Sequence, residues 1–212
     1  MIPSDDDKSA APADTLDTLF SQTRVIQRRD FLATGAAMMG MAYAGDAIAA
    51  PASAPTDKDR EYMRQAIALM RKAGVVERTG GAFGCVIVRD GEILAATGNS
   101  VLRDNDPSAH AEVNAIRAAC KKVGAPNIRG AVMYTSCECC PMCYATAYWA
   151  RVSKIYYAAA WTDYADLFDD FNIAQDMKRP YAKRTVKVET LLRNEANQVW
   201  QEFRKLPDRA KY

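Results

Sequence analysis

The chain has 212 residues, of which 49% are apolar and 25% are charged, and its formal net charge is +2. This composition excludes a disordered chain and a fibrous repeat, and the length suits one domain with a tail. The small net charge comes without a run of Lys or Arg, so we expect no nucleic-acid partner. Two counts are unusual: the chain has six cysteines and a single histidine, His110.

An export signal is predicted over residues 1–49. The pair Arg28-Arg29 precedes a short apolar stretch at 33–45, and an Ala-x-Ala site ends at Ala49. This order is typical of a secretory signal of the twin-arginine type. The apolar stretch is too short to span a bilayer, so we expect no stable membrane anchor. The sequence therefore predicts cleavage after Ala49, export to the periplasm, and a linker over residues 50–56.

Residues 57–212 are predicted to form one domain in which helices and strands alternate. Apolar residues at helical spacing predict a helix from Asp57 to about Ala73. Strands over 83–88 and 92–97 are predicted to form a hairpin that turns at Asp90-Gly91. The remaining predicted elements, in chain order, are a helix over 110–122, a strand over 131–135, a helix over 141–151, a strand over 154–160, short helices over 163–168 and 171–177, a strand over 185–190 and a helix over 195–205. This order predicts an α/β layered domain with a mixed sheet.

The residues with chemical potential form two motifs, His110-Ala111-Glu112 and Cys140-Pro141-Met142-Cys143. Two cysteines on the first turn of a helix place both sulfurs on one side, where the positive helix end favours thiolates. One His and two Cys ligands leave the fourth tetrahedral position of a zinc ion open for water. Glu112, two residues beyond the His ligand, can then move protons in a hydrolytic deamination. The two motifs together are the signature of zinc deaminases.

Two other interpretations of the cysteine cluster stay open at this point. Cys137 or Cys139 could supply a fourth ligand and close a purely structural zinc site. Alternatively, the Cys-x-x-Cys pair could be a thiol-redox motif without turnover of a base.

From about Glu61 to Tyr212 the chain resembles the cytidine deaminase superfamily and, within it, the bacterial guanine deaminases. The matching stretches are residues 80–84, 106–112, 140–143, 148–151, 162–163 and 168–170. The resemblance implies a three-layer α/β fold with a mixed five-stranded sheet between helices. It also implies a homodimer with exchanged C-terminal segments and a small-molecule purine substrate, with guanine and water converted to xanthine and ammonia.

The resemblance further assigns roles to single residues. Zinc is implied to bind His110, Cys140 and Cys143, and the implied catalytic residues are Glu112, as proton shuttle, and Asp170, beside the exocyclic amine. The residues implied to bind the base are Asn99, Phe83, Ala111, Trp149 and Tyr212. Several of these have a structural alternative, because Asn99 fits a turn, Phe83 and Trp149 fit a core, and Asp170 fits a helix cap.

Two positions depart from this family's usual pattern. Ala82 and Cys139 stand where the family usually has Pro, and the change at 82 is expected to widen the base pocket. Another amino-heterocycle or nucleoside, such as guanosine, a pterin, a triazine or isocytosine, therefore remains the alternative substrate.

Overall fold

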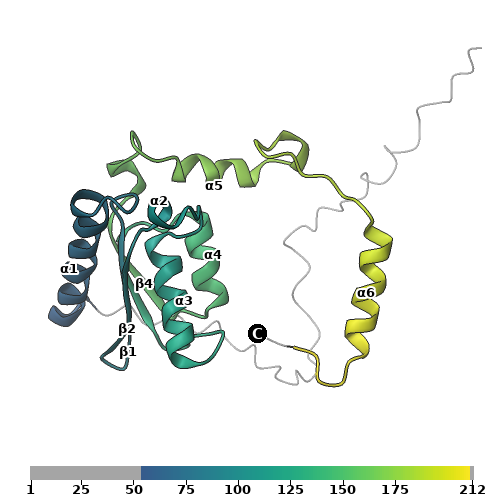
Figure 1. The fold of residues 1–212 in the computed structure, drawn as a ribbon, viewed down its shortest axis with the longest axis horizontal. Helices are drawn as coiled ribbons and strands as arrows, with labels where there is room; N and C mark the ends of the chain where they lie inside the picture. Colours follow the sequence, from purple (N-terminus) through teal and green to yellow (C-terminus); the bar gives the residue numbers. More distant parts are fainter. Residues whose placement is uncertain (1–53, 211–212) are drawn as a thin grey trace, which may run out of the picture. The chain divides into compact units, whose positions relative to one another are not determined.

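The computed structural model describes residues 54–210, so the predicted export signal and Tyr212 lie outside the described residues. A four-stranded mixed sheet lies at the centre of this part of the chain, in the order β2-β1-β3-β4 (Figure 1). Its strands are β1 (Gly84–Arg89), β2 (Glu92–Gly98), β3 (Val132–Cys137) and β4 (Lys154–Ala159). Strand β1 runs antiparallel to β2 and to β3, whereas β3 and β4 are parallel. The predicted mixed sheet is confirmed.

The hairpin between β1 and β2 turns where the sequence predicts. Asp90 and Gly91 have φ angles of 52° and 81°, and Arg89 pairs with Glu92 on either side of them. Positive φ at both central residues defines the type I′ turn, whose twist matches that of the flanking strands. The local sequence is therefore sufficient to set the register of this strand pair at the turn.

Helices cover both faces of the sheet and complete a three-layer α/β fold (Figure 1). Helix α1 packs on one face, and helices α3 and α4 pack on the other. The helices are α1 (Asp57–Arg71), α2 (Val101–Asp104), α3 (Ala111–Val123), α4 (Pro141–Trp149), α5 (Asp170–Lys178) and α6 (Arg193–Lys205). A π-helical turn, η1 (Lys72–Val76), extends α1, and 3-10 turns occupy η2 (Trp161–Asp163) and η3 (Tyr181–Lys183).

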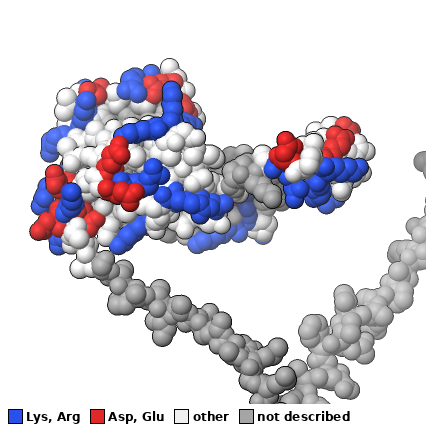
Figure 2. Space-filling view, turned by 90° about the horizontal axis from the view of Figure 1, so that it is seen from below, with Lys and Arg blue, Asp and Glu red and all other residues white. Residues whose placement is uncertain are grey.

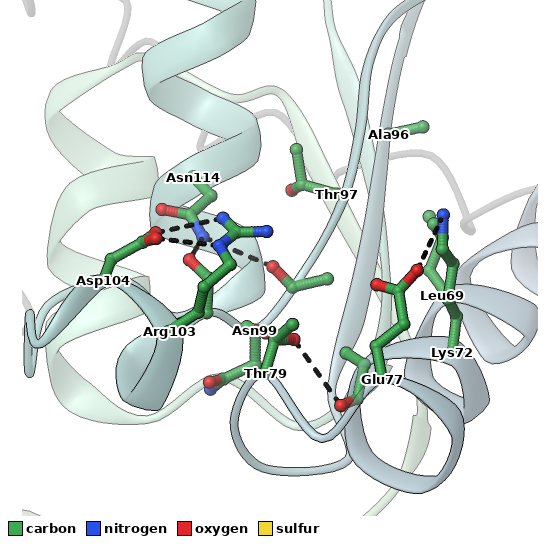
Figure 3. Close-up of a pocket in the computed structure, with 13 residues that line it drawn as sticks. Leu69, Lys72, Glu77, Thr79, Ala96, Thr97, Asn99, Arg103, Asp104 and Asn114 are labelled. Carbon is green, nitrogen blue, oxygen red and sulfur yellow. Dashed lines mark hydrogen bonds and ion pairs between the residues drawn. The ribbon is translucent and has the colours of Figure 1, made fainter.

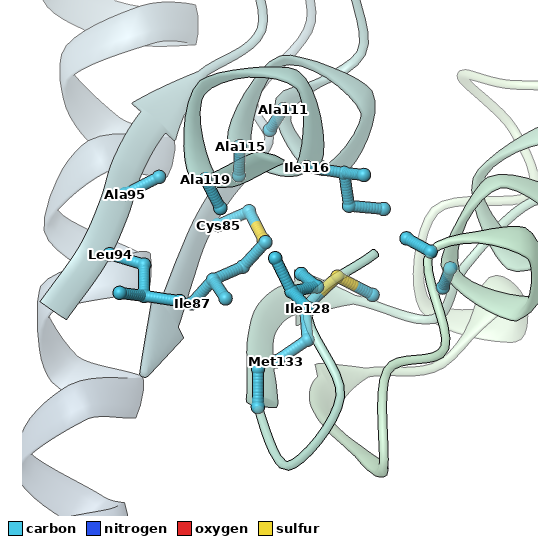
Figure 4. Close-up of a cluster of buried hydrophobic side chains, with 13 residues drawn as sticks. Cys85, Ile87, Leu94, Ala95, Ala111, Ala115, Ile116, Ala119, Ile128 and Met133 are labelled. Carbon is cyan, nitrogen blue, oxygen red and sulfur yellow. The ribbon is translucent and has the colours of Figure 1, made fainter. Parts of the chain in front are cut away.

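The larger hydrophobic core lies between the sheet and α3. Ala111, Ala115 and Ala119 form a stripe along α3 that faces Cys85 and Ile87 of β1 (Figure 4). Residues four apart share one face of a helix, and a stripe of alanines lets the helix backbone lie close to the sheet. This close packing fixes the start of α3, which carries the His110-Ala111-Glu112 motif, against the sheet.

The smaller core lies on the other face, where alternate residues of β1 meet α1. Val86 and Val88 pack with Tyr62 and Ala66 of α1. Helix α1 begins with a capping box in which Thr56 Oγ1 accepts a hydrogen bond from the backbone N–H of Asp59, and the Asp59 carboxylate accepts one from the backbone N–H of Thr56. The other oxygen of Asp59 accepts a hydrogen bond from the hydroxyl of Tyr134 on β3. The cap thus joins the first turn of α1 to the sheet.

The expected fifth strand is wrong for this chain on its own. Residues 185–190 form no strand, and all of them are exposed. The sheet in the described part of the chain has four strands rather than five. An extended segment is a strand only when its backbone pairs with a neighbour. The predicted helix over 163–168 is also wrong, because the only helical turn there is η2, which ends at Asp163. Helix α2 and the π-helical extension of α1 are not predicted by the sequence.

Helix α6 confirms the predicted closing helix and exposes its apolar side. Ala196, Val199, Trp200 and Phe203 recur at spacings of three and four, so they share one face. None of the residues of α6 is buried, and Trp200 is 56% exposed. The helix therefore presents an unpartnered apolar stripe within the described part of the chain.

The surface carries both signs of charge. On the face shown in Figure 2, Lys and Arg side chains are interspersed with Asp and Glu side chains. Pairs such as Lys122–Glu92, with 2.7 Å between Nζ and Oε1, contribute to this pattern. Over residues 54–210, no helix combines the length and the apolar character that crossing a membrane requires.

Candidate active site and metal centre

Two helix starts bring the predicted zinc ligands together. His110 is the N-cap residue of α3, and Cys140 is the N-cap residue of α4, each with extended backbone. Cys143 follows in the first turn of α4, and Pro141 occupies the first helical position, where its missing N–H costs nothing. Because both helices point their N-termini at one place, their dipoles favour thiolates there.

The geometry of the three side chains fits a tetrahedral zinc ion. His110 Nδ1 lies 3.7 Å from Cys140 Sγ and 3.6 Å from Cys143 Sγ. All three ligand atoms lie within 4.8 Å of one another. Tetrahedral angles with the usual Zn–N and Zn–S bond lengths place N and S about 3.6 Å apart. His110, Cys140 and Cys143 therefore form a zinc site without rearrangement.

Neither Cys137 nor Cys139 joins this group of ligand atoms in the described part of the chain. Cys139 packs against the two hydrophobic clusters that flank α4, and burial raises the pKa of its thiol. Burial also raises the pKa of Cys137 to about 11. Because neither thiol belongs to the ligand group, the geometry argues against a closed four-ligand site and leaves the fourth zinc position free for water.

The three ligand side chains are coupled to one another through hydrogen bonds. The hydrogen bond with Cys143 lowers the pKa of Cys140, and the same hydrogen bond raises the pKa of Cys143. The hydrogen bond with Cys140 raises the pKa of His110. A thiolate beside a histidine and a second thiol is a soft ligand set of the kind that selects zinc.

Glu112 lies beside the metal ligands without being one of them. Its side chain is 3% exposed, and burial raises its pKa. Oε1 accepts a hydrogen bond from Thr135 Oγ1 at 2.9 Å, and Oε2 lies 3.5 Å from Cys143 Sγ. A buried carboxylate with a raised pKa, next to an open metal position, is suited to proton transfer.

A pocket of about 340 Å³ opens beside the cluster and is mostly apolar. This volume is at the small end of ligand pockets, about 300–1,000 Å³, and suits a single base. The lining residues are Gly80, Gly81, Phe83, Asn99, Val101, Leu102, His110, Glu112, Glu138, Cys140, Phe168 and Asp170. Phe83 and Phe168 meet edge to face, with ring centroids 5.0 Å apart, and form an aromatic wall.

Asn99 is held in the pocket wall by its own backbone turn. Its side chain is 3% exposed, and Oδ1 accepts a hydrogen bond from the backbone N–H of Val101 at 3.1 Å. The hydroxyl of Thr79 donates to the backbone carbonyl of Asn99 at 2.6 Å. Among residues 54–210, the Nδ2 group of Asn99 has no hydrogen-bond partner. The turn alternative and the binding role are therefore compatible, because the turn uses Oδ1 and leaves the amino group to a ligand.

Asp170 lies on the pocket wall as the first residue of α5. The N-cap position belongs to Asp169, so Asp170 is not the helix cap that the sequence also allows. Asp170 Oδ2 lies 3.3 Å from the hydroxyl of Tyr164, and burial raises the pKa of the carboxyl. The carboxyl groups that line the pocket are therefore Glu112, beside the metal cluster, Asp170, from α5, and Glu138, whose Oε2 accepts a hydrogen bond from the backbone N–H of Trp161.

Comparison with known proteins now decides the family. Residues 56–159 match the cytidine and deoxycytidylate deaminase zinc-binding region. A guanine deaminase from Bacillus subtilis is 41% identical over 152 residues, which cover 71% of this chain and 97% of that protein. The chain belongs to the cytidine and deoxycytidylate deaminase family. It is therefore a zinc-dependent deaminase.

Two further similarities define its place among deaminases. The crystal structure of the Bacillus subtilis guanine deaminase superposes with a TM-score of 0.69 at 41% identity, covering 72% of this chain and 98% of that one. A tRNA-specific adenosine deaminase from Agrobacterium fabrum is 40% identical over 98 residues, covering 46% of this chain and 63% of that protein. The similarity to the guanine deaminase is thus the more extensive of the two.

Two of the predicted base-binding residues, Trp149 and Ala111, do not line the pocket that the described residues form. Trp149 is 55% exposed at the end of α4, where its ring meets that of Tyr148. Ala111 is fully buried in the core between α3 and the sheet, and Tyr212 lies outside the described residues. Neither residue is among those that line the pocket in the described part of the chain, so the binding roles of Trp149 and Ala111 stay predictions.

Other residues that line the pocket were not predicted from the sequence to bind the base. Gly80-Gly81 and Phe168 belong to stretches that match the family, and these stretches were the signal that could have identified them. Leu102 and Val101 come from α2, which has four residues and no hydrophobic periodicity. No sequence signal predicts them.

A second hollow, of about 310 Å³, lies near Asn99 between the end of α1 and α2 (Figure 3). Its charged side chains pair locally, with Lys72 Nζ 3.5 Å from Glu77 Oε1 and Arg103 Nε 2.8 Å from Asp104 Oδ1. Paired, exposed charges contribute little to recognition. The deaminase chemistry belongs to the pocket that holds the metal cluster.

Proposed function

We propose that this enzyme converts guanine and water to xanthine and ammonia. The assignment of guanine as the substrate rests on the extent of the similarity to the Bacillus subtilis guanine deaminase. The matched region covers 97% of that protein and is 41% identical in sequence. The match to the tRNA-specific adenosine deaminase covers only 63% of that relative. The small pocket, with one aromatic wall and a few polar groups, supports a free base as substrate.

The predicted site residues that line the pocket each have a task in this reaction. Zinc, when bound by His110, Cys140 and Cys143, supplies Lewis-acid activation of a water molecule. Glu112 accepts a proton from that water and delivers it to a ring nitrogen of the base. Asp170 contacts the exocyclic amino group and assists its protonation as the C–N bond breaks and ammonia leaves, and the Nδ2 group of Asn99 donates a hydrogen bond to an acceptor on the purine. Phe83 packs against the base.

A substrate panel on purified protein tests this proposal. Ammonia release is followed from guanine, guanosine, adenine, cytosine, isocytosine and a pterin, with and without a zinc chelator. We expect the highest kcat/KM with guanine and loss of activity in the chelator. Faster turnover of another compound would replace guanine as the substrate, and no turnover by zinc-loaded protein would refute the proposed activity.

The proposed assembly is a homodimer in which C-terminal segments are exchanged. Two features support it: β4 is an edge strand, and α6 exposes Val199, Trp200 and Phe203 along one side. Residues 185–190 alternate as a strand would and are available to pair with the β4 edge of a second copy. Light scattering should give twice the chain mass, and Trp200→Glu should give monomers. A monomeric wild-type protein would refute the proposal.

The proposed location is the periplasm. The order of Arg28-Arg29, the apolar stretch and the Ala-x-Ala site supports export by the twin-arginine route. Mass spectrometry of the exported protein should find Ala50 at the N-terminus, and replacing both arginines by lysines should keep the protein in the cytoplasm. An intact Met1 terminus on protein from the periplasm would contradict cleavage.

A further inference from the structure

The hydroxyl of Thr135 contacts the carboxylate of Glu112 from the sheet. Thr135 lies on β3, pairs with Cys85 of β1 and is fully buried. Its Oγ1 donates to Glu112 Oε1 at 2.9 Å. Because β3 has a strand on each side, the backbone that carries this hydroxyl is paired both to Cys85 of β1 and to Tyr157 of β4.

The two oxygens of Glu112 consequently have different surroundings. Oε1 is hydrogen-bonded to the sheet, whereas Oε2 faces the metal ligands, 3.5 Å from Cys143 Sγ. We propose that Thr135 is a positioning residue, which holds Oε1 so that Oε2 is the oxygen that exchanges protons with water and the base. Thr135 does not line the pocket, so it acts only through Glu112.

Orientation of this kind has a large effect on rate. Proton transfer requires the donor and acceptor atoms to lie within hydrogen-bond distance in the reacting geometry. A carboxylate on a helix can rotate about its side-chain torsions, and a buried one that lacks a partner also bears an uncompensated desolvation cost. A single fixed hydroxyl donor removes both problems, and it does so without occupying the working oxygen.

The proposal rests on the proposed function, and its test uses kinetics of the full-length enzyme on guanine. Thr135→Val keeps the shape and removes the donor, Thr135→Ser keeps the donor, and Thr135→Ala serves if the valine variant does not fold. We expect Thr135→Val to lower kcat by roughly tenfold to hundredfold, as for loss of a hydrogen bond to a charged group. KM should stay within about twofold and the zinc content should be unchanged. Thr135→Ser should keep most of the wild-type kcat.

Thr97→Val is the matched control. The Thr97 hydroxyl donates to the backbone carbonyl of Ala111 at 2.7 Å, so it also supports the first turn of α3 but does not touch the carboxylate. We expect a kcat close to that of the wild type for this variant. An equal loss of kcat in Thr97→Val would show that any loosening of α3 slows the enzyme, and would overturn the proposal.

Two further outcomes separate the proposal from the function on which it rests. A folded, zinc-loaded Thr135→Val enzyme with wild-type kcat would overturn the positioning role while guanine deamination stood. A wild-type enzyme that releases no ammonia from guanine would refute the proposed function and, with it, the role of Thr135 in that reaction. A loss of kcat in Thr135→Ser equal to that in Thr135→Val would also overturn the role of the hydroxyl.

Discussion

Gly80 makes room for the side chain of Asn99. A Cβ atom at position 80 would lie 1.9 Å from Asn99 Oδ1, far inside van der Waals contact. The neighbouring Gly81 has the same relationship to the aromatic wall, since its Cβ would lie 2.7 Å from the ring of Phe83. The glycine pair is therefore part of the shape of the base pocket rather than only a flexible turn.

We expect Gly80→Ala to weaken substrate binding. The added methyl group must displace the Asn99 side chain, so KM for guanine should rise roughly tenfold, about the value of one hydrogen bond, with a smaller effect on kcat. Steady-state kinetics measure both constants. In the Asn99→Ala background the same change should add little, because the displaced group is already missing. Fully additive losses would contradict this coupling.

Zinc content should distinguish the cysteine ligands from their neighbours. Cys143→Ser removes a ligand, so the variant should bind zinc poorly and lose ammonia release. Cys139→Ser alters a half-buried thiol outside the cluster and should retain about one zinc ion per chain. Metal analysis after dialysis against a chelator measures the difference. A loss of zinc in Cys139→Ser equal to that in Cys143→Ser would make Cys139 a ligand.

Glu112→Gln should separate metal binding from catalysis. The amide keeps the size of the side chain but cannot accept and return a proton, so the rate of ammonia release should fall by about 10²–10⁴-fold. Glu112 is not part of the ligand group, so zinc content should remain unchanged. Activity close to wild type in a zinc-loaded variant would remove Glu112 from the mechanism.

The capping box of α1 should make the free energy of unfolding depend on pH. Hydrogen bonds, first from the Thr56 hydroxyl and then from Tyr134, lower the pKa of Asp59 below its ordinary value of 3.8. The pKa of Asp59 is therefore lower in the folded state than in the unfolded state, and ionised Asp59 stabilises the fold at any pH above the unfolded-state pKa. This stabilisation is lost as the pH falls through the folded-state pKa. Thr56→Ala should therefore cost about 1 kcal/mol near neutral pH.

Denaturant unfolding near neutral pH and at about pH 3 measures this effect. The gap between wild type and Thr56→Ala should narrow in acid, where Asp59 becomes protonated. Thr162→Ala, at an exposed position in the 3-10 turn η2, is the matched control and should change stability by less than about 0.5 kcal/mol at either pH. A gap that widens in acid would contradict the role of ionised Asp59.

Local chemistry made parts of this structure predictable from sequence. The Asp90-Gly91 turn is set by two residues that tolerate positive φ, and the continuous apolar run of β1 follows from its burial on both faces. The zinc ligands were predictable as well, because a histidine and a Cys-x-x-Cys pair at helix starts need only short-range geometry to converge. Here the spacing of residues carries the information.

Other features depend on contacts between distant parts of the chain. The orientation of Trp149 is set by the face of α4 that packs on α3, and no local pattern gives it. Residues 185–190 have the alternation of a strand but lack a neighbour, so their conformation depends on what they meet. Leu102 enters the pocket through a helix of four residues, which is too short for a periodic signal.

The free edge of β4 has a consequence for handling the protein. Its outward backbone groups have no strand beside them in the part of the chain described, and the strand carries Tyr157, which is 52% exposed. Such an edge is a template for adding further strands. A truncated chain that ends before residue 185 would keep this edge and lose the segment best suited to cover it. Solutions of that truncated protein should become turbid as their concentration rises, whereas the complete chain stays clear.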